Sequence, residues 1–507
     1  MDSGGFSLWL LSADSEILNG CLGRSTCPFI KEKFEQTKFA EFAANVLQDS
    51  DMKEVFFLST VAAIATPNAA GGISVIRISG ENALDVAAKV FKGKNPLEMD
   101  GYTCAYGYIH DNGEFLDDVV LTVFKAPKSY TGENIAEISC HGGIFISRRI
   151  LRLVLKNGAE LAPAGEFTKR AFLNGKMSLT QAEAVMDIIS AESSNELKYA
   201  VSLREGACFR RVKAVSDKIV SVLGNLSVWA DYPDEDIPEI EPDALKNSLS
   251  AILDELESTS RTYDYGRIMR EGINTAIVGK PNVGKSTLMN CLSGFRRSIV
   301  TDIAGTTRDV VEESVRLGSL TLRLSDTAGI RMTDDEIEKI GVDIAYSRLD
   351  EADLVLAVFD CTVPLCDDDF SLIEKLKSKK AVAVINKSDS KTVTDMDFIK
   401  NSFKYCVEIS AKDNIGINRL SECLEEMFIN NDIPAEKGII ANERQKSCVE
   451  KALGAVKEAL NALENGEMLD AVTVLLDEAL SALLELTGEK VTDTVVNDVF
   501  SRFCVGK

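Results

Sequence analysis

The chain has 507 residues and a formal net charge of -23, with 45% hydrophobic and 27% charged side chains. This length predicts about three domains, and the composition is typical of a globular protein with sizeable cores. The negative charge excludes a general nucleic-acid-binding surface, because phosphates would be repelled. Any RNA contact must therefore use a local basic patch or the surface of a partner.

The cysteines and the apolar segments indicate a cytoplasmic protein with no membrane contact. The twelve cysteines form no CxxC pair, so neither a zinc site nor a dense disulfide scaffold is predicted, and reduced thiols fit best. The longest apolar stretch, 55–65, is too short to cross a bilayer, which needs about 20 residues.

Residues 1–51 fit no targeting signal. Acidic side chains outnumber basic ones there and Arg24 is the single arginine, whereas a transit peptide is rich in Arg and poor in acids. We expect a disordered extension or a start site chosen upstream of Met52.

The first patterned region, 52–174, predicts a mixed α/β domain. Strand-like runs lie within 56–79, at 119–124 and at 135–140. Helical spacing follows at 82–91 and, after Gly142-Gly143, up to residue 155.

The rest of the chain predicts an α/β domain inserted into a helical one. Residues 175–271 and 436–507 carry apolar spacing of three and four. Between them, 272–435 alternate helices with strand runs, which are 275–278, 354–359 and 381–385, and this alternation signals a parallel sheet. The two helical segments are expected to pack together. The predicted fold class is therefore a multidomain combination of α/β and all-α domains.

A nucleotide site is predicted at residues 279–286, Gly-Lys-Pro-Asn-Val-Gly-Lys-Ser, which match GxxxxGK[ST] between a strand and a helix. Backbone N–H groups of Asn282, Val283 and Gly284 would curl around phosphate oxygens at the helix N-terminus. Lys285 would reach the β- and γ-phosphates, and the Ser286 hydroxyl would bind Mg²⁺. This motif alone would also fit an ATPase.

Three further elements, each after a strand run, predict that the nucleotide is GTP. Asp326-Thr327-Ala328-Gly329 would bring a carboxylate near Mg²⁺ and an N–H to the γ-phosphate. In Asn386-Lys387-Ser388-Asp389, the Asp389 carboxylate can accept two hydrogen bonds from guanine, and adenine has no such donor pair. Ser410-Ala411-Lys412 would bring the Ala411 N–H to guanine O6. The four elements together predict a Ras-like GTPase domain at 272–435.

A switch loop is expected between the P-loop and Asp326, in Gly305-Thr306-Thr307-Arg308-Asp309. Thr307 would bind Mg²⁺ through its hydroxyl and the γ-phosphate through its N–H. The remaining residues expected to line the GTP site are Thr287, Thr301, Asp302, Ile303, Ala304, Gly305 and Thr306.

The hydrolytic machinery must differ from that of Ras. Ras-type enzymes place a glutamine after the glycine of the DTAG element to orient the attacking water, and this chain has Ile330 there. Arg331 is adjacent, and four carboxylates follow, any of which could hold a water: Asp334, Asp335, Glu336 and Glu338. Composition does not choose between them.

The motifs together resemble one family almost throughout the chain. Outside the GTPase elements they are IRISG at 76–80, YTGE at 130–133, CHGG at 140–143, PAGEFT at 163–168, RAFLNGK at 170–176, QAEA at 181–184 and RFCVGK at 502–507. From about Met52 to its end, the chain is similar to the MnmE/TrmE family of tRNA-modification GTPases. It departs from the family in its N-terminal extension, in Gln445 where His is usual, and in Val505 where Ile is commoner.

The resemblance implies an architecture and a reaction. Residues 52–174 would be a folate-binding domain that dimerises, followed by the two-segment helical domain and the inserted G domain. The family adds a (carboxymethyl)aminomethyl group at C5 of the wobble uridine of certain tRNAs. It takes one carbon from a tetrahydrofolate derivative (5-formyl- or methylene-tetrahydrofolate). A homodimer in a heterotetramer with the FAD- and NADH-dependent partner MnmG (GidA) is implied.

Charged residues match the positions that hold folate in the family, namely Arg77, Glu137, Lys176 and Lys507. Arg or Lys suits the glutamate tail of folate, and Glu137 suits the N–H groups of the pterin. Cys504 lies in the tail, where the resemblance implies a mechanistic role and packing is the alternative.

The family also implies how hydrolysis proceeds without the glutamine. Its G domains pair in a K⁺-dependent way, and a cation beside the β- and γ-phosphates can replace an arginine finger. Asn282 matches the K⁺-binding position, and further K⁺ oxygens would come from Thr301, Ile303 and Thr306. Glu338, three residues before Gly341, matches the water-orienting carboxylate.

Two other functions compete with this one. A ribosome-assembly GTPase switch would share the G domain, but such relatives usually carry a basic RNA-binding appendage, which this acidic sequence does not show. A folate-dependent one-carbon transferase with a merely regulatory G domain would share 52–174 and would not require K⁺-stimulated hydrolysis.

Overall fold

The computed structural model describes residues 59–231, 242–294, 313–324, 352–428 and 438–506. The chain divides into two compact units. Unit 1 runs to Ser129 and includes Glu133–Ala162, and unit 2 consists of Tyr130–Gly132 and Pro163–Lys507. The domain boundaries predicted from the sequence stay predictions.

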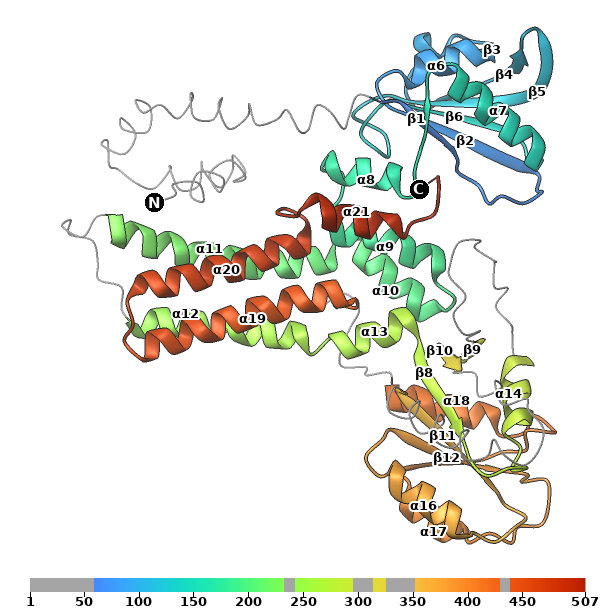
Figure 1. Ribbon diagram of the computed structural model, residues 1–507, viewed down its shortest axis with the longest axis vertical. Helices are drawn as coiled ribbons and strands as arrows, with labels where there is room; N and C mark the ends of the chain where they lie inside the picture. Colours follow the sequence, from blue (N-terminus) through green and yellow to red (C-terminus); the bar gives the residue numbers. More distant parts are fainter. Residues whose placement is uncertain (1–58, 232–241, 295–312, 325–351, 429–437, 507) are drawn as a thin grey trace, which may run out of the picture. The chain divides into compact units, whose positions relative to one another are not determined.

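Unit 1 is a seven-stranded sheet with helices on one face (Figure 1). Its strands lie in the order β3-β4-β5-β6-β2-β1-β7 and pair antiparallel, except that β7 is parallel to β1. The strands are β1 Val61–Ile64, β2 Ile73–Ser79, β3 Phe91–Lys92, β4 Thr103–Asp111, β5 Glu114–Phe124, β6 Ile135–His141 and β7 Glu160–Leu161; the helices are α6 Ala83–Val90, η1 Pro96–Glu98 and α7 Ile144–Lys156.

The two faces of this sheet differ because side chains alternate along each strand. Ile76, Leu121 and Ile138 are fully buried on the side that α6 and α7 cover. On the opposite side Tyr106 is 61% exposed and Val120, its partner across β4 and β5, is 40% exposed. This second face is the open sheet face.

The helical part of unit 2 comes from both ends of its sequence. Its helices are α8 Glu166–Leu173, α9 Leu179–Ser190, α10 Ser194–Arg204, α11 Ala207–Asp231, α12 Pro242–Ser260, α13 Tyr263–Glu271, α19 Glu443–Glu464, α20 Leu469–Thr487 and α21 Asp493–Ser501. Capping boxes begin α9 at Ser178 and α10 at Ser193. Helix α19 packs on α12 and α20 on α11 (Figure 1), which confirms that the two helical segments form one domain.

The inserted part of unit 2 is a six-stranded sheet in the order β13-β12-β11-β8-β10-β9. Its pairs are parallel except the β9–β10 hairpin. The elements are β8 Ile273–Val278, α14 Lys285–Gly294, β9 Glu313–Leu317, β10 Leu320–Leu324, β11 Leu354–Asp360, α16 Asp367–Leu376, β12 Ala381–Asn386, α17 Met396–Ser402, β13 Tyr405–Glu408 and α18 Ile417–Phe428. Parallel strands bring their carboxyl ends to one edge, where ligands of such sheets bind. Among the helices of the described ranges, none has the length and hydropathy that a membrane crossing requires.

Candidate functional site

The P-loop, residues 279–286, joins β8 to α14 and needs glycine at two positions. Gly279 has φ of +148°, and a Cβ there would lie 2.4 Å from the Val358 carbonyl oxygen. Gly284 has φ of +99°, and a Cβ there would lie 2.2 Å from Asn386 Nδ2. Any larger residue would push the loop away from the ends of β11 and β12.

Lys285 lies across this loop. Its Nζ donates to the carbonyl oxygens of Gly279 at 2.6 Å and Lys280 at 2.7 Å. Burial lowers the pKa of Lys285, because desolvation disfavours the ammonium. A phosphate group bound beside Lys285 would stabilise the buried ammonium charge. This is the role that the P-loop motif predicts for the lysine.

Asn386 connects three of the four predicted elements. Its side chain is buried, Nδ2 donates to the Val283 carbonyl at 2.9 Å, and Oδ1 accepts from the Ala411 N–H at 3.0 Å. The sequence predicted Asn386 as a GTP-binding residue. Its contacts in the structure make it a positioning residue that joins the P-loop, the NKSD element and the SAK element.

Lys387 extends over the P-loop. It has φ of +66°, and its Nζ donates to the Asn282 carbonyl at 3.0 Å and to Asp360 Oδ2 at 2.5 Å. Burial alone would raise the pKa of Asp360, but hydrogen bonds from Lys387 and Thr362 lower it below its ordinary value. Asp360 was missed at the sequence level, although an acidic residue that ends an apolar strand run at this edge is a usable signal.

Asp389 presents an exposed carboxylate at the end of β12. Its Oδ1 accepts a hydrogen bond of 2.7 Å from Ser410 Oγ, and that bond is the main cause of a lowered pKa of Asp389. The carboxylate is therefore ionised and can only accept hydrogen bonds. That is the chemistry that reads the paired N–H donors of guanine.

The other predicted GTP-site residues are partly described. Ser286 and Thr287 are exposed at the start of α14, and Lys412 is exposed beyond Ala411. The following lie outside the described residues: Thr301, Asp302, Ile303, Ala304, Gly305, Thr306, Thr307, Asp326, Thr327, Ala328, Gly329, Arg331 and Glu338. Their roles stay predictions.

Two of the predicted folate residues lie together on the open sheet face of unit 1. Arg77 on β2 is directly opposite Glu137 on β6, and Arg77 Nε donates to Glu137 Oε1 at 2.7 Å. Their side chains keep 16% and 23% of their surface exposed. Lys176 is exposed in the turn after α8 in unit 2, and Lys507 lies outside the described residues.

The C-terminal tail pairs with the segment before α8. Val505 forms an antiparallel bridge with Ala164, and the Gly165 N–H donates to the Cys504 carbonyl at 3.4 Å. Gly165 has φ of +72°, and a Cβ there would lie 2.5 Å from the Phe500 carbonyl oxygen. Two motifs far apart in the sequence, PAGEFT and RFCVGK, therefore meet. The Cys504 side chain is partly exposed beside this contact.

Comparison with protein families shows which family these motifs belong to. The family model for the TrmE N-terminus, described as a GTP-binding protein, matches residues 60–176. The model for the MnmE helical domain matches residues 179–504, more than half of the chain. This chain belongs to the MnmE/TrmE family. As a member of that family, it is a GTP hydrolase that acts in tRNA modification.

Full-length relatives agree with the family models. A protein of Acetivibrio thermocellus named tRNA modification GTPase MnmE is 40% identical over 455 residues, which cover 88% of this chain and 99% of the relative. One of Clostridioides difficile with the same name is 41% identical over 461 residues, 89% of this chain and 100% of the relative. The similarity to MnmE proteins thus spans their whole length.

Solved structures match a smaller part of the chain. Era of Aquifex aeolicus, bound to GDP.AlF4-, is 28% identical with a TM-score of 0.25, over 36% of this chain and 66% of that one. The G domain of the T. maritima FeoB protein is 26% identical with a TM-score of 0.24, over 30% of this chain and 97% of that one.

Proposed function

We propose that this MnmE-family chain couples GTP hydrolysis to modification of the wobble uridine in certain tRNAs. The product would carry a (carboxymethyl)aminomethyl group at C5, built with a carbon from 5-formyl- or methylene-tetrahydrofolate. The chain would work with the FAD- and NADH-dependent MnmG (GidA) protein in the cytoplasm. One observation carries this proposal: an exposed Asp389 carboxylate held by Ser410 and the Arg77–Glu137 pair occur in one chain whose relatives are tRNA modification GTPases.

The G domain would bind GTP through the residues that the structure joins at one sheet edge. Asp389 would read guanine, Lys285 would hold the β- and γ-phosphates, and Asn386 keeps both loops in register. Ser286 and Thr307 would hold Mg²⁺, and the exposed hydroxyl of Ser286 at the start of α14 fits such a ligand. When bound, Mg²⁺ neutralises phosphate charge.

A K⁺ ion would complete the site beside Asn282. Asn282 is exposed on the P-loop and has φ of +64°. An amide oxygen suits a monovalent cation, and Thr301, Ile303 and Thr306 would add oxygens. Glu338 would orient the attacking water in place of the glutamine, with Arg331 close by in sequence.

The folate group would bind over the open sheet face of unit 1. Glu137 offers a carboxylate to pterin N–H groups, and Arg77 holds that carboxylate through the 2.7 Å bond. The family resemblance also gives Lys176 and Lys507 as folate-binding residues. Cys504 is proposed to have a mechanistic role in the reaction.

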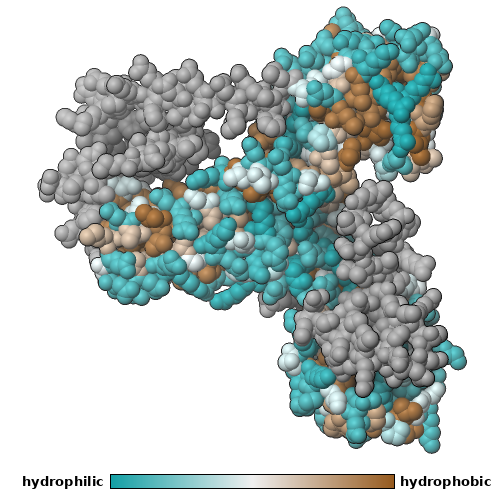
Figure 2. Space-filling view, viewed as in Figure 1, coloured by the Kyte–Doolittle hydropathy of each residue, from teal (hydrophilic) through white to brown (hydrophobic). Residues whose placement is uncertain are grey.

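A second copy of the chain would cover part of the same face. Tyr106 and Tyr108 are 61% and 42% exposed, and their rings lie 5.5 Å apart beside the exposed Val120. On the side drawn in Figure 2, unit 1 also carries an apolar area. Contiguous apolar surface of this kind marks an interaction site, which supports a homodimer.

The proposal is tested by nucleoside analysis of tRNA from cells that lack this chain. We expect wobble uridines without the C5 group and an otherwise normal nucleoside profile. Normal wobble uridines in those cells would contradict the proposed function. The ribosome-assembly alternative predicts normal wobble uridines together with an accumulation of ribosomal precursors.

A further inference from the structure

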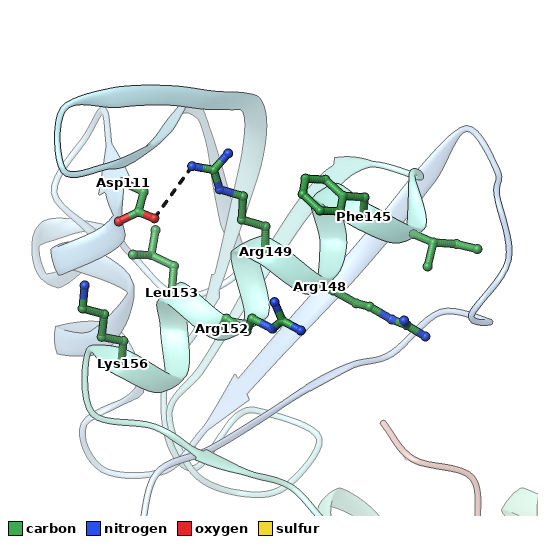
Figure 3. A pocket seen from close by; sticks show the side chains of 8 residues that line it. Asp111, Phe145, Arg148, Arg149, Arg152, Leu153 and Lys156 are labelled. Carbon is green, nitrogen blue, oxygen red and sulfur yellow. Dashed lines mark ion pairs between the residues drawn. The ribbon is translucent and has the colours of Figure 1, made fainter.

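Helix α7 of unit 1 carries a row of cations on an otherwise acidic chain. Its buried side chains, Ser147, Ile150, Leu153 and Val154, hold it against the sheet. Its sequence, IFISRRILRLVLK, contains no acidic residue. The basic side chains define what we call the basic α7 face: Arg148, Arg149, Arg152 and Lys156 (Figure 3). The net charge of -23 makes such a cluster stand out.

Three of these four cations are not neutralised by the part of the chain that the structure describes. Arg149 is paired, with Glu114 at 2.5 Å and Asp111 at 4.0 Å. Arg148 Nη2 donates to the neutral amide of Asn68 at 3.2 Å. Within the described ranges, Arg152 and Lys156 have no ion-pair partner, and both are exposed.

The three basic residues are evenly spaced along the helix axis. Arg148, Arg152 and Lys156 follow one another at four-residue intervals, so a helical rise of 1.5 Å per residue separates their Cα atoms by about 6 Å along the axis. They border a pocket of about 580 Å³. A small anion would need only one of these cations. A row of regularly placed basic residues instead suits the repeated charges of a phosphodiester backbone.

An aromatic ring lies at the N-terminal end of the same row. Phe145 lines the pocket and is 77% exposed, and Figure 3 shows its ring standing out from the first turn of α7. Proteins that bind single-stranded nucleic acids use an exposed ring beside cations, because a base can stack on the ring while the phosphates contact the positive charges.

We infer that the basic α7 face binds the backbone of RNA and that Phe145 stacks on one of its bases. This inference rests on the proposed function, which supplies tRNA as the RNA. At the basic α7 face, an acidic chain can contact a polyanion without the repulsion that its overall negative charge would cause elsewhere on the surface. RNA is favoured over an anionic membrane, because Phe145 is a single ring beside evenly spaced charges rather than part of a broad apolar stripe.

The first test measures binding of a tRNA transcript to the full chain at several KCl concentrations. The variant R148Q/R152Q/K156Q removes the three cations. The matched control K94Q/K198Q/K451Q makes the same charge change at exposed lysines that have no ion-pair partner within the described ranges. We expect the first variant to bind at least roughly tenfold more weakly at low salt. We also expect its salt slope to fall by about 2, since each released phosphate contact contributes about 0.7 to 0.9. The control should keep the wild-type slope.

The second variant, Phe145→Ala, tests the stacking role separately. We expect affinity for tRNA to fall roughly fivefold or more with an unchanged salt slope. GTP hydrolysis should be the same in all these variants, because none of the substituted residues lies in the G domain. The circular dichroism spectrum and the denaturant unfolding of each variant, compared with the wild type, show whether unit 1 still folds.

Four results would overturn the inference. The first is an absence of tRNA binding by the wild-type chain. The others are equal losses in both triple variants, wild-type binding by R148Q/R152Q/K156Q, or a loss that affects vesicles of phosphatidylglycerol but not tRNA. Nucleoside analysis decides the proposed function independently. Weakened RNA binding with normal wobble uridines would reject the proposed function and keep the basic α7 face.

Discussion

At the scale of single residues, the Asp389–Ser410 contact is the most informative part of the guanine site. The 2.7 Å bond from Ser410 Oγ fixes one carboxylate oxygen and lowers the pKa of Asp389. The exposed carboxylate can therefore accept from two N–H donors, and replacement by an amide would present a donor to guanine N1–H. We therefore expect specificity for GTP over other nucleotides to depend on this one carboxylate.

Asp389→Asn should exchange the nucleotide preference. We expect GTP affinity to fall by roughly 10²-fold or more, since a mispaired polar group in a hydrogen-bonding site is strongly rejected. Affinity for xanthosine triphosphate should rise, because xanthine offers an acceptor where guanine offers its amino group. Titration with fluorescent nucleotides measures both. Unchanged GTP affinity would show that Asp389 does not read the base.

Glu338→Ala tests the proposed water-orienting group. We expect GTP binding to persist while turnover falls roughly 10²-fold, the usual contribution of a positioned general base or water-holding group. Single-turnover hydrolysis with a nucleotide-binding titration separates the two quantities. Wild-type turnover would remove Glu338 from this role, and Asp335→Ala is the matched control among the neighbouring carboxylates.

At the scale of elements, one buried ion pair joins the two helical segments. Glu183 on α9 receives Arg444 Nε at 2.9 Å and Gln445 Nε2 at 2.8 Å from α19. Gln445 also accepts from the Ala441 N–H at 3.0 Å. Gln445, which replaces the histidine usual in the family, therefore uses both its amide oxygen and its amide nitrogen in structural hydrogen bonds.

Glu183→Gln should destabilise the helical domain by roughly 3 kcal/mol, because it leaves the buried Arg444 charge uncompensated. Burial alone would raise the pKa of Glu183, but Arg444 lowers it overall. The stabilisation is therefore present above the ordinary carboxyl pKa and is lost as the pH falls through the folded-state pKa. Denaturant unfolding at neutral and acidic pH measures this, with the surface variant Lys457→Gln as control. An equal effect of the two substitutions would contradict the account.

The sequence was most informative where strands are buried on both sides. Runs predicted at 354–359 and 381–385 are β11 and β12, whose side chains are all buried, since parallel strands between helices read as continuous apolar segments. Strand β4 was not predicted, because small and exposed aromatic residues alternate along it and half of its side chains face the open sheet face. The buried strand runs also made it possible to predict one nucleotide site, because each of its elements directly follows such a run. These elements contain the P-loop, Asn386, Asp389 and Ala411.

Contacts between distant segments were not accessible to sequence patterns. Nothing in the spacing of residues around Asp360 indicates that Lys387 donates a hydrogen bond to it. Likewise, nothing in the PAGEFT and RFCVGK motifs indicates that Ala164 and Val505 pair. Such contacts depend on how the chain packs in three dimensions, and the spacing of apolar residues along the sequence does not reveal them. The basic α7 face was also missed, because apolar residues between the cations dominate the helical pattern.

At the scale of the whole molecule, hydrolysis is expected to depend on a cation. The chain has Ile330 where a water-orienting glutamine is usual, and Asn282 stands exposed on the P-loop. We expect GTP hydrolysis to rise when K⁺ replaces Na⁺, and Asn282→Ala to lose this rise while it still binds GTP. Steady-state hydrolysis in matched chloride salts measures the effect. Equal rates in both salts would reject the K⁺ proposal.

We propose that GTP binding by the G domain drives modification at the wobble uridine. The most direct test of this proposal is nucleoside analysis of tRNA from cells that lack the chain and carry either the wild-type gene or Asp389→Asn. We predict that the wild type restores the C5 group and that Asp389→Asn, expressed at the same level, does not. Full restoration by Asp389→Asn would contradict the account.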